Sequence, residues 1–235
     1  MSELILEVND IHTFIGQFHI LEGVSVTVQQ GGITVLLGRN GAGKTTTLRS
    51  ILGLANVRSG HVQFQGREIR GMRPYKVAQL GIGYVPEHRA IFRDLTVEEN
   101  LRIAERKPGD LAKRREFIYS LFPDLERLGH LGGNQLSGGQ QQMLSVARAL
   151  VPENQLLLID EPSEGLAPVI IEQMMEAIRQ LSVHTTVLLV EQNFRMASQL
   201  ADQFVIIEEG KSVLAGRMSE LVGNTELINR YLGAA

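Results

Sequence analysis

The chain has 235 residues, of which 43% are hydrophobic and 21% charged, with a formal net charge of −3 at pH 7. This length is enough for one domain with a sizeable core. The nearly balanced charge argues against a protein that coats nucleic acid, so we expect no nucleic-acid partner. The lack of cysteine excludes a disulfide scaffold, a thiolate zinc site and cysteine catalysis. Because the apolar runs are short and no basic segment opens the chain, we predict neither a membrane span nor a signal peptide, and expect a cytoplasmic protein.

Short apolar runs alternate with helical patterns along most of the chain, which predicts an α/β fold with a largely parallel sheet. The predicted buried strands are rich in leucine or β-branched residues and cover residues 33–37, 156–159, 187–190 and 204–207. The N-terminal part differs, because runs at 4–8, 24–28 and 61–65 are joined by turns that contain glycine. We interpret these runs as an antiparallel β layer beside the main sheet.

The stretch from 88 to about 130 is rich in charges of both signs, which predicts a helical insertion with solvated faces. Thr96 and Glu99 match a capping box that opens a helix, and a second helix is predicted over 114–121. We predict a single domain over residues 1–235. Its α/β core with the β layer comprises 1–87 and 151–235, and its helical subdomain comprises 88–150.

A glycine-rich loop follows the predicted strand 33–37, precedes a helical pattern and completes the motif G-x-x-x-x-G-K-[ST]. Gly38, Gly41 and Gly43 allow positive φ angles, so that amide N–H groups converge on a phosphate. Lys44 adds a charge for the β- and γ-phosphates, and Thr45 adds a hydroxyl for Mg²⁺. A plain glycine turn is a poor alternative in this strand–loop–helix order. The predicted nucleotide-binding residues are Gly38, Arg39, Asn40, Gly41, Ala42, Gly43, Lys44, Thr45 and Thr46.

Two acidic residues, Asp160 and Glu161, follow the predicted strand 156–159. In a parallel sheet they lie at the carboxyl edge, where ligands bind in such folds. We predict that Asp160 holds Mg²⁺ through water, and that Glu161 orients or deprotonates the attacking water. The plain alternative is a pair of carboxylates that cap a turn, and the phosphate loop in the same chain disfavours it.

A second anion-binding helix start is predicted ahead of a helix over 141–150, at Leu136, Ser137, Gly138, Gly139 and Gln140. Ser137 is the predicted N-cap, and the two glycines expose backbone N–H groups. One γ-phosphate does not need two cradles from one subunit. We therefore predict a head-to-tail dimer, in which each ATP lies between the phosphate loop of one subunit and residues 137–140 of the other.

The segments LSGGQ, GRNGAGKTT and LLLIDEP together resemble the ATP-binding cassette ATPases of membrane transporters, over essentially the whole chain. The resemblance implies a P-loop NTPase fold, ATP and Mg²⁺ as ligands, and ATP hydrolysis coupled to transport. More narrowly, the chain resembles the ATPase subunit of branched-chain amino acid importers. The segments that carry this likeness are 84–87, 95–101, 161–168 and 189–193. The ATPase subunits of urea and short-amide importers have similar sequences in these segments.

The resemblance also implies an assembly at the cytoplasmic face of the inner membrane. In that family two ATPase subunits, usually different ones, pair beneath two transmembrane permease subunits that an extracytoplasmic substrate-binding protein feeds. Whether this chain forms a homodimer or a heterodimer stays open. We expect the helical insertion, about 88–130, to dock on the permease, with the approach near 86–95 because this segment leads out of the predicted site.

The sequence departs from the wider family at four places. Glu87 stands where most members have a Gln that reaches Mg²⁺ and the attacking water, so Glu87 is a predicted catalytic residue and metal ligand, or else makes a surface ion pair. Gln192 replaces a common His, and its amide can donate a hydrogen bond to the γ-phosphate but cannot shuttle a proton. Ala167 replaces a common Asp at a dimer contact. The aromatic residue that usually stacks on adenine falls at Ile15, so either Ile15 or Phe14 meets the base, unless Phe14 is a core residue.

Other functions fit the sequence less well. GTPases and small-molecule kinases do not need a second anion-binding helix start such as LSGGQ. The sequence also contains no N-K-x-D guanine motif. Cassette ATPases of DNA repair or translation usually carry a long coiled coil or two cassettes, and neither is found in this sequence. The changes at Glu87, Ala167 and Gln192 leave a weakly catalytic regulatory cassette as an alternative to the ATP-hydrolysing importer subunit.

Overall fold

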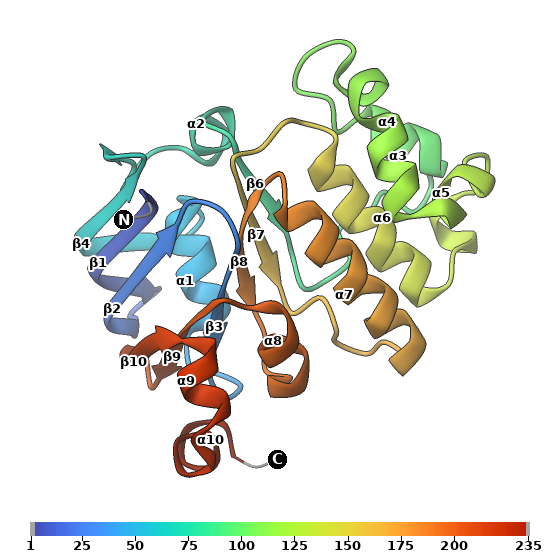
Figure 1. The fold of residues 1–235 in the computed structure, drawn as a ribbon. Helices are drawn as coiled ribbons and strands as arrows, with labels where there is room; N and C mark the ends of the chain where they lie inside the picture. The colour runs from blue at the N-terminus through green and yellow to red at the C-terminus, as the bar shows by residue number, and fades with distance from the viewer. Residues whose placement is uncertain (1–2, 234–235) are drawn as a thin grey trace.

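The computed structural model describes residues 3–233, so the ends of the predicted domain, 1–2 and 234–235, lie outside the described residues. The described strands form one sheet of four strands and one of six. Figure 1 shows the smaller sheet at one end, the larger sheet in the middle and a group of helices at the other end. The predicted α/β class is confirmed.

The four-stranded sheet has the order β2-β1-β4-β5, and each neighbouring pair in it is antiparallel. Its strands are β1 (Leu4–Ile15), β2 (Phe18–Gln29), β4 (Asn56–Phe64) and β5 (Arg67–Glu68). The predicted antiparallel layer is therefore confirmed. β1 and β2 are longer than the apolar runs that predicted them, because a tight turn at Gly16, with φ of 60°, continues their pairing up to Ile15 and Phe18.

The six-stranded sheet has the order β10-β9-β3-β8-β7-β6 and is parallel except for β10. Its strands are β3 (Ile33–Leu37), β6 (Ile82–Val85), β7 (Leu156–Asp160), β8 (Thr186–Val190), β9 (Gln203–Glu208) and β10 (Lys211–Arg217). All residues of β3, β7 and β8 are buried, which explains why they read as unbroken apolar runs. The carboxyl ends of these strands meet at one edge of the sheet.

Helices cover both faces of the six-stranded sheet. α1 (Lys44–Ile51) packs between the two sheets, where Leu48 and Ile51 join a core with the side chains that point to that face. α7 (Pro168–Ser182) and α8 (Phe194–Leu200) pack on the opposite face. The shorter helices are α2 (Pro74–Gln79), α9 (Met218–Val222) and α10 (Thr225–Leu232).

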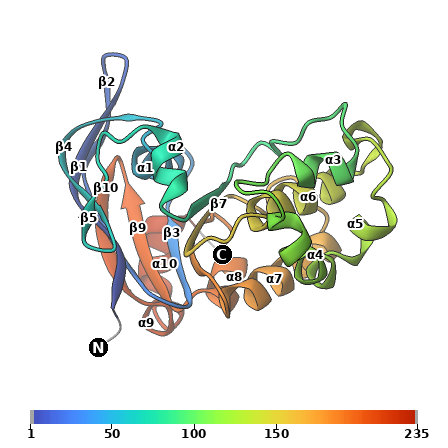
Figure 2. The same cartoon turned by 90° about the horizontal axis from the view of Figure 1, so that it is seen from above.

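The helical region lies between β6 and β7 in the chain and on the side away from the antiparallel sheet (Figure 2). It consists of α3 (Val97–Arg102), α4 (Asp110–Leu121), α5 (Pro123–Arg127), a 3₁₀ turn (Gly133–Gln135) and α6 (Gly138–Leu150). The predicted capping box is confirmed, since Glu99 N–H donates to Thr96 Oγ1 and the Glu99 carboxylate accepts from Thr96 N–H. α4 begins earlier than predicted, because Gly109 takes a left-handed φ of 89° directly before Asp110.

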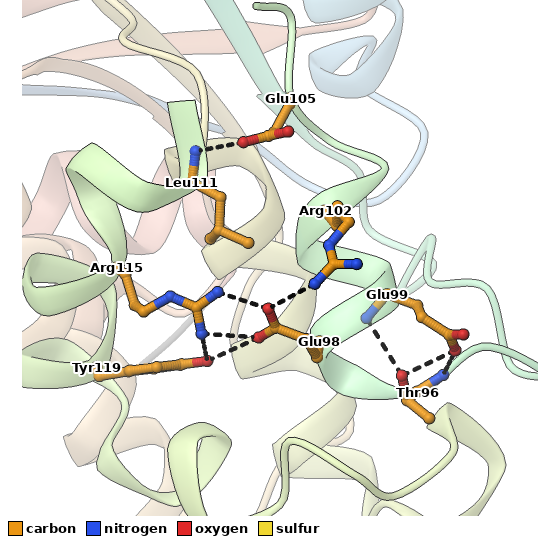
Figure 3. A network of polar contacts seen from close by, with 8 residues as sticks. All are labelled: Thr96, Glu98, Glu99, Arg102, Glu105, Leu111, Arg115 and Tyr119. Carbon is orange, nitrogen blue, oxygen red and sulfur yellow. Dashed lines mark hydrogen bonds and ion pairs between the residues drawn. The ribbon is translucent and has the colours of Figure 1, made fainter. Parts of the chain in front are cut away.

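A polar network joins the first two helices of this region (Figure 3). Glu98 of α3 accepts two hydrogen bonds from the Arg115 guanidinium of α4, at 2.9 and 2.5 Å, and one from Tyr119 Oη at 3.3 Å. Arg102 lies 3.5 Å from the same carboxylate. The hydrogen bonds from Arg115 lower the pKa of Glu98, despite partial burial. The network fixes α3 against α4 independently of the sheet.

Among residues 3–233, no helix combines the length and the apolar character that crossing a bilayer requires.

Candidate functional site

The glycine loop between β3 and α1 has the backbone that a phosphate cradle needs. Gly38, Gly41 and Gly43 have φ angles of 152°, 80° and 111°, as predicted. A Cβ at Gly38 would lie 2.2 Å from the carbonyl oxygen of Ile207, and one at Gly43 would lie 2.6 Å from Leu21 Cδ2. Gly43 is the N-cap of α1 and has no side chain to cap it, so the first N–H groups of α1 stay free to bind an anion.

Lys44 is buried at the bottom of this loop, with 4% of its surface exposed. Its Nζ donates to the carbonyl oxygens of Gly38 at 3.0 Å and Arg39 at 3.2 Å, and forms an ion pair with Glu161 Oε1 at 3.1 Å. The ammonium is thus aimed into the loop, and its charge is balanced by the Glu161 carboxylate, which directly follows β7.

Asp160 lies at the end of β7, fully buried next to α1. Thr45 Oγ1 donates to Asp160 Oδ1 at 3.0 Å, and Tyr84 Oη donates to Asp160 Oδ2 at 3.3 Å. Burial raises the pKa of Asp160 to about 6, although the hydrogen bonds from Thr45 and Tyr84 lower it. The structure therefore brings together the hydroxyl and the carboxylate that the sequence selected as metal ligands.

Glu161 adopts an unusual backbone conformation, with a φ of 43°. Such a conformation is strained for a residue with a side chain and clusters at functional sites. Its N–H donates to the Val190 carbonyl of β8 at 2.9 Å, and its carbonyl accepts from Glu164 N–H at 3.2 Å. These bonds turn the chain so that the Glu161 carboxylate faces Lys44 and the phosphate loop.

A further buried carboxylate, Glu191, follows β8 directly and was not selected from the sequence. None of its surface is exposed, and it accepts hydrogen bonds from the N–H groups of Ser163 at 3.2 Å and Asn193 at 3.1 Å. Burial raises its pKa to about 7, while these hydrogen bonds act in the opposite direction. The available signal was an acidic residue at the end of an apolar strand, the same signal that selected Asp160. Gln192, the next residue, is exposed.

Glu87 lies in the loop after β6 and is partly buried, with 30% of its side chain exposed. Its carboxylate is 3.7 Å from His88 Nδ1 and raises the pKa of the neighbouring Glu164. Its negative charge also contributes to the raised pKa of Asp160. Glu87 thus adds negative charge near both the end of β7 and the loop that follows Glu161.

The second glycine segment, Leu136 to Gln140, starts α6 and is called the signature segment below. Ser137 is its N-cap, because Gln140 N–H donates to Ser137 Oγ at 3.3 Å and Ser137 N–H donates to Gln140 Oε1 at 2.9 Å. The predicted start of the helix at 141 is wrong: α6 begins at Gly138, since this capping box includes both glycines in the first turn.

The surroundings of the signature segment differ from those of the phosphate loop. A Cβ at Gly138 would lie 2.7 Å from Arg89 Nη1, and one at Gly139 would lie 2.8 Å from Ile170 Cγ2. Within residues 3–233, no hydrogen bond joins the signature segment to the phosphate loop. Ser137 is exposed. The two predicted anion-binding helix starts are therefore separate sites of one chain.

The candidate adenine contacts lie at the turn between β1 and β2. The Phe14 ring stacks on His19 at 4.2 Å, nearly parallel at 5°, and the Arg58 guanidinium lies 3.9 Å from the same ring centre. The His19 ring and the Arg58 guanidinium are both too close to the Phe14 ring to lie on the same face of it. They therefore cover its two opposite faces. Ile15 is 48% exposed beside it.

Ala167, the remaining departure from the family pattern, is the exposed N-cap of α7.

Comparison with known proteins agrees with this geometry. The model of the ABC transporter family matches residues 21–164. The chain is 39% identical to the high-affinity branched-chain amino acid transport ATP-binding protein BraG of Pseudomonas aeruginosa, over 97% of this chain and 99% of BraG. It is 37% identical to LivF of Archaeoglobus fulgidus, a probable branched-chain amino acid transport ATP-binding protein, over 92% of this chain and 94% of LivF.

A solved structure supports the fold independently. It is the ADP conformation of an ATP-binding cassette of an ABC transporter, which superposes with a TM-score of 0.85 at 24% identity, over 99% of this chain and 100% of that one. Together, the family match and the two relatives show that the chain belongs to the ABC transporter family, as an ATP-binding and ATP-hydrolysing subunit.

Proposed function

We propose that this chain is the ATP-hydrolysing subunit of an importer of branched-chain amino acids, and that it works as one half of a head-to-tail dimer. The observation that carries the proposal is a set of contacts at the carboxyl edge of the six-stranded sheet. Lys44 contacts Glu161, and Thr45 contacts Asp160, all beside the phosphate loop. This set combines a cation for phosphates, hard oxygens for a divalent metal and a carboxylate for the attacking water.

ATP binding begins at the phosphate loop, residues 38–46. The N–H groups at the start of α1 bind the phosphates, and Lys44 neutralises their charge. A phosphate oxygen at Lys44 Nζ competes with the Glu161 carboxylate for the same ammonium, so that binding frees Glu161 for the reaction. Because both faces of Phe14 are covered, Ile15 is the proposed contact of the adenine.

The residues at the end of β7 fit Mg²⁺. Thr45 Oγ1 and Asp160 Oδ1 are hard oxygens 3.0 Å apart, and Asp160 carries a raised pKa that a neighbouring cation would lower. Thr45 and Asp160 are the proposed ligands, Asp160 through water, with Glu87 as a third. Mg²⁺ bound there supplies charge neutralisation for the phosphates.

Hydrolysis uses the groups around the γ-phosphate. Glu161 orients the attacking water and accepts its proton, and the side-chain amide of Gln192 donates a hydrogen bond to the γ-phosphate. Lys44 and the N–H groups of α1 stabilise the negative charge of the phosphoryl group during transfer. Glu87, whose negative charge contributes to the raised pKa of Asp160, is the proposed further carboxylate at the water or the metal.

The signature segment completes the site of the partner subunit. The partner's Ser137 presents its hydroxyl, and the two glycines after it present free N–H groups, to the γ-phosphate, which then bridges the two subunits. Hydrolysis removes this bridge and lets the dimer open. The helical region, with the segment 86–95 that leads out of the site, transmits the movement to two transmembrane permease subunits.

The relatives BraG and LivF favour branched-chain amino acids over urea or short amides as the cargo. The test is reconstitution of the chain in lipid vesicles with its co-purified membrane subunits and binding protein. We expect leucine to stimulate ATP hydrolysis and urea to have no effect. Stimulation by urea alone would contradict the cargo class. An assembled transporter in which this chain's own site does not hydrolyse ATP would favour a regulatory cassette instead.

A further inference from the structure

A buried carboxylate lies directly before Gln192, and the reaction outlined above does not use it. Glu191 is fully buried at the end of β8. Its two oxygens serve different loops, since Oε1 accepts from Ser163 N–H at 3.2 Å and Oε2 accepts from Asn193 N–H at 3.1 Å. The first loop follows Glu161 and the second carries Gln192. One side chain therefore joins the two loops that hold the proposed reacting groups.

The backbone around Glu191 fixes this junction in the sheet. Glu191 N–H donates to the Leu36 carbonyl of β3 at 3.2 Å, and the Val190 carbonyl accepts from Glu161 N–H at 2.9 Å. The segment from Glu161 to Ser163 is thus attached to the end of β8 at both of its ends. The strained φ of 43° at Glu161 needs such attachment, because a residue keeps that conformation only where its surroundings fix it.

Packing alone does not account for a carboxylate at this position. The four residues before it, 187–190, are apolar and buried, as expected in the middle of a parallel sheet. A buried carboxylate is costly unless hydrogen bonds satisfy it. Here each oxygen accepts one backbone N–H from a different loop, and an amide side chain has only one oxygen to do the same.

We propose that Glu191 is a positioning residue for ATP hydrolysis, which couples the loop after Glu161 to the loop of Gln192 so that both keep one geometry around the γ-phosphate. The inference rests on the proposed roles of Glu161 and Gln192. Its kinetic consequence is a specific loss of turnover. ATP binding depends on the phosphate loop, and the hydrogen bond from Glu191 N–H goes to Leu36 of β3, the strand that precedes this loop.

The test compares Glu191→Ala and Glu191→Gln with the wild-type chain. We expect Glu191→Ala to lower kcat by about 10- to 100-fold and to change KM for ATP by less than about threefold, because displaced reacting groups slow the chemical step. Glu191→Gln retains one acceptor and should show an intermediate kcat. Hydrogen exchange of the Ser163 and Asn193 amides should accelerate in Glu191→Ala while the amides of β8 keep their protection.

Asn154→Ala is the matched control, because Asn154 is also buried and polar but precedes β7 at the other end of the strand. If Asn154→Ala lowers the melting temperature as much as Glu191→Ala does, it should still retain the wild-type kcat. If Glu191→Ala retains kcat, or if Asn154→Ala loses as much, the positioning role is overturned. If Glu191→Ala does not fold, Glu191→Gln decides: a wild-type kcat with both amides still protected overturns the proposal.

Two additional variants separate this inference from the proposed function. In a Gln192→Ala background, Glu191→Ala should lower kcat by less than it does alone, since part of its effect passes through Gln192. Fully additive losses in kcat would contradict the coupling of the two loops.

If Glu161→Gln hydrolyses ATP like the wild type, the proposed role of Glu161 fails. If Glu161→Gln is inactive while Glu191→Ala is fully active, only the inference on Glu191 fails.

Discussion

The start of α1 and the start of α6 are both glycine-rich helix N-termini, but they have different surroundings. At α1 the free N–H groups lie beside Lys44, Asp160 and Glu161, which the same chain supplies. At α6 the Ser137 side chain caps the Gln140 N–H, the Arg89 guanidinium lies next to Gly138, and Ser137 is exposed. One helix start thus has a full set of groups for phosphate chemistry, and the other has only the anion-binding part.

This difference is what the proposed head-to-tail dimer requires, with each subunit contributing one half of a site. In the proposed site, the start of α1 binds and hydrolyses the triphosphate and leaves one side of the γ-phosphate to the partner subunit. The start of α6 offers donors without a metal site or a base. A head-to-tail pair combines the two. The following predictions test each half separately.

The largest effect is expected from removing the proposed general base, Glu161, beside the start of α1. Glu161→Gln keeps the shape of the side chain but removes the carboxylate that accepts a proton, so kcat should fall by about 10²- to 10⁴-fold. ATP binding, measured by equilibrium titration, should remain because Lys44 and the loop are unchanged. Hydrolysis at the wild-type rate would exclude Glu161 as the base.

The second largest effect is expected from changing Ser137 at the start of α6. Ser137→Ala should lower ATP hydrolysis by about tenfold or more, while ATP binding to the isolated subunit is unchanged. Thr96→Ala is the matched control, since Thr96 also caps a helix in a capping box. Both variants should lose about 1 kcal/mol of stability in urea unfolding. Equal ATPase losses in the two variants would show that Ser137 acts only as a cap.

A smaller effect is expected at Gln192. Gln192→Ala removes an amide that only orients the γ-phosphate, so kcat should fall by about tenfold and less than in Glu161→Gln. Steady-state kinetics of the two variants under identical conditions make the comparison. A greater loss at Gln192 than at Glu161 would reverse the assigned roles.

The smallest effect concerns the helical region alone. Glu98→Gln should lower the free energy of unfolding by about 1 kcal/mol at pH 7, because the ion pair with Arg115 is partly exposed. The pKa of Glu98 is lower in the folded state, so its stabilisation is present above the unfolded pKa of about 4.3 and is lost as the pH falls through the folded pKa. Urea unfolding at several pH values measures this. A difference between variant and wild type that stays constant down to pH 3 would contradict it.

The parts of the site that could be predicted from the sequence are those encoded by short local patterns. The strand–loop–helix motif indicated Lys44 and Thr45, and the end of an apolar strand indicated Asp160 and Glu161. The start of α6 was also encoded, since Ser137 and Gln140 form a capping box, although the two glycines inside it have a low helix propensity.

Other features depend on contacts between segments far apart in the chain. Glu191 binds N–H groups of two loops, and no residue type marks a backbone donor. The covered faces of Phe14 depend on Arg58 of β4, which a reading of β1 alone cannot place. The strained backbone of Glu161 follows from its hydrogen bond to β8 and leaves no trace in the sequence pattern.

The most direct test of the shared site is to mix two inactive variants of this chain. Lys44→Ala disables the phosphate loop and keeps the signature segment, whereas Ser137→Arg blocks the signature segment and keeps the loop. If ATP lies between subunits, a mixed dimer has one intact site, and an equal mixture should regain about a quarter of the wild-type ATPase activity. A mixture no more active than the separate variants, beside an active wild type, would contradict the shared site.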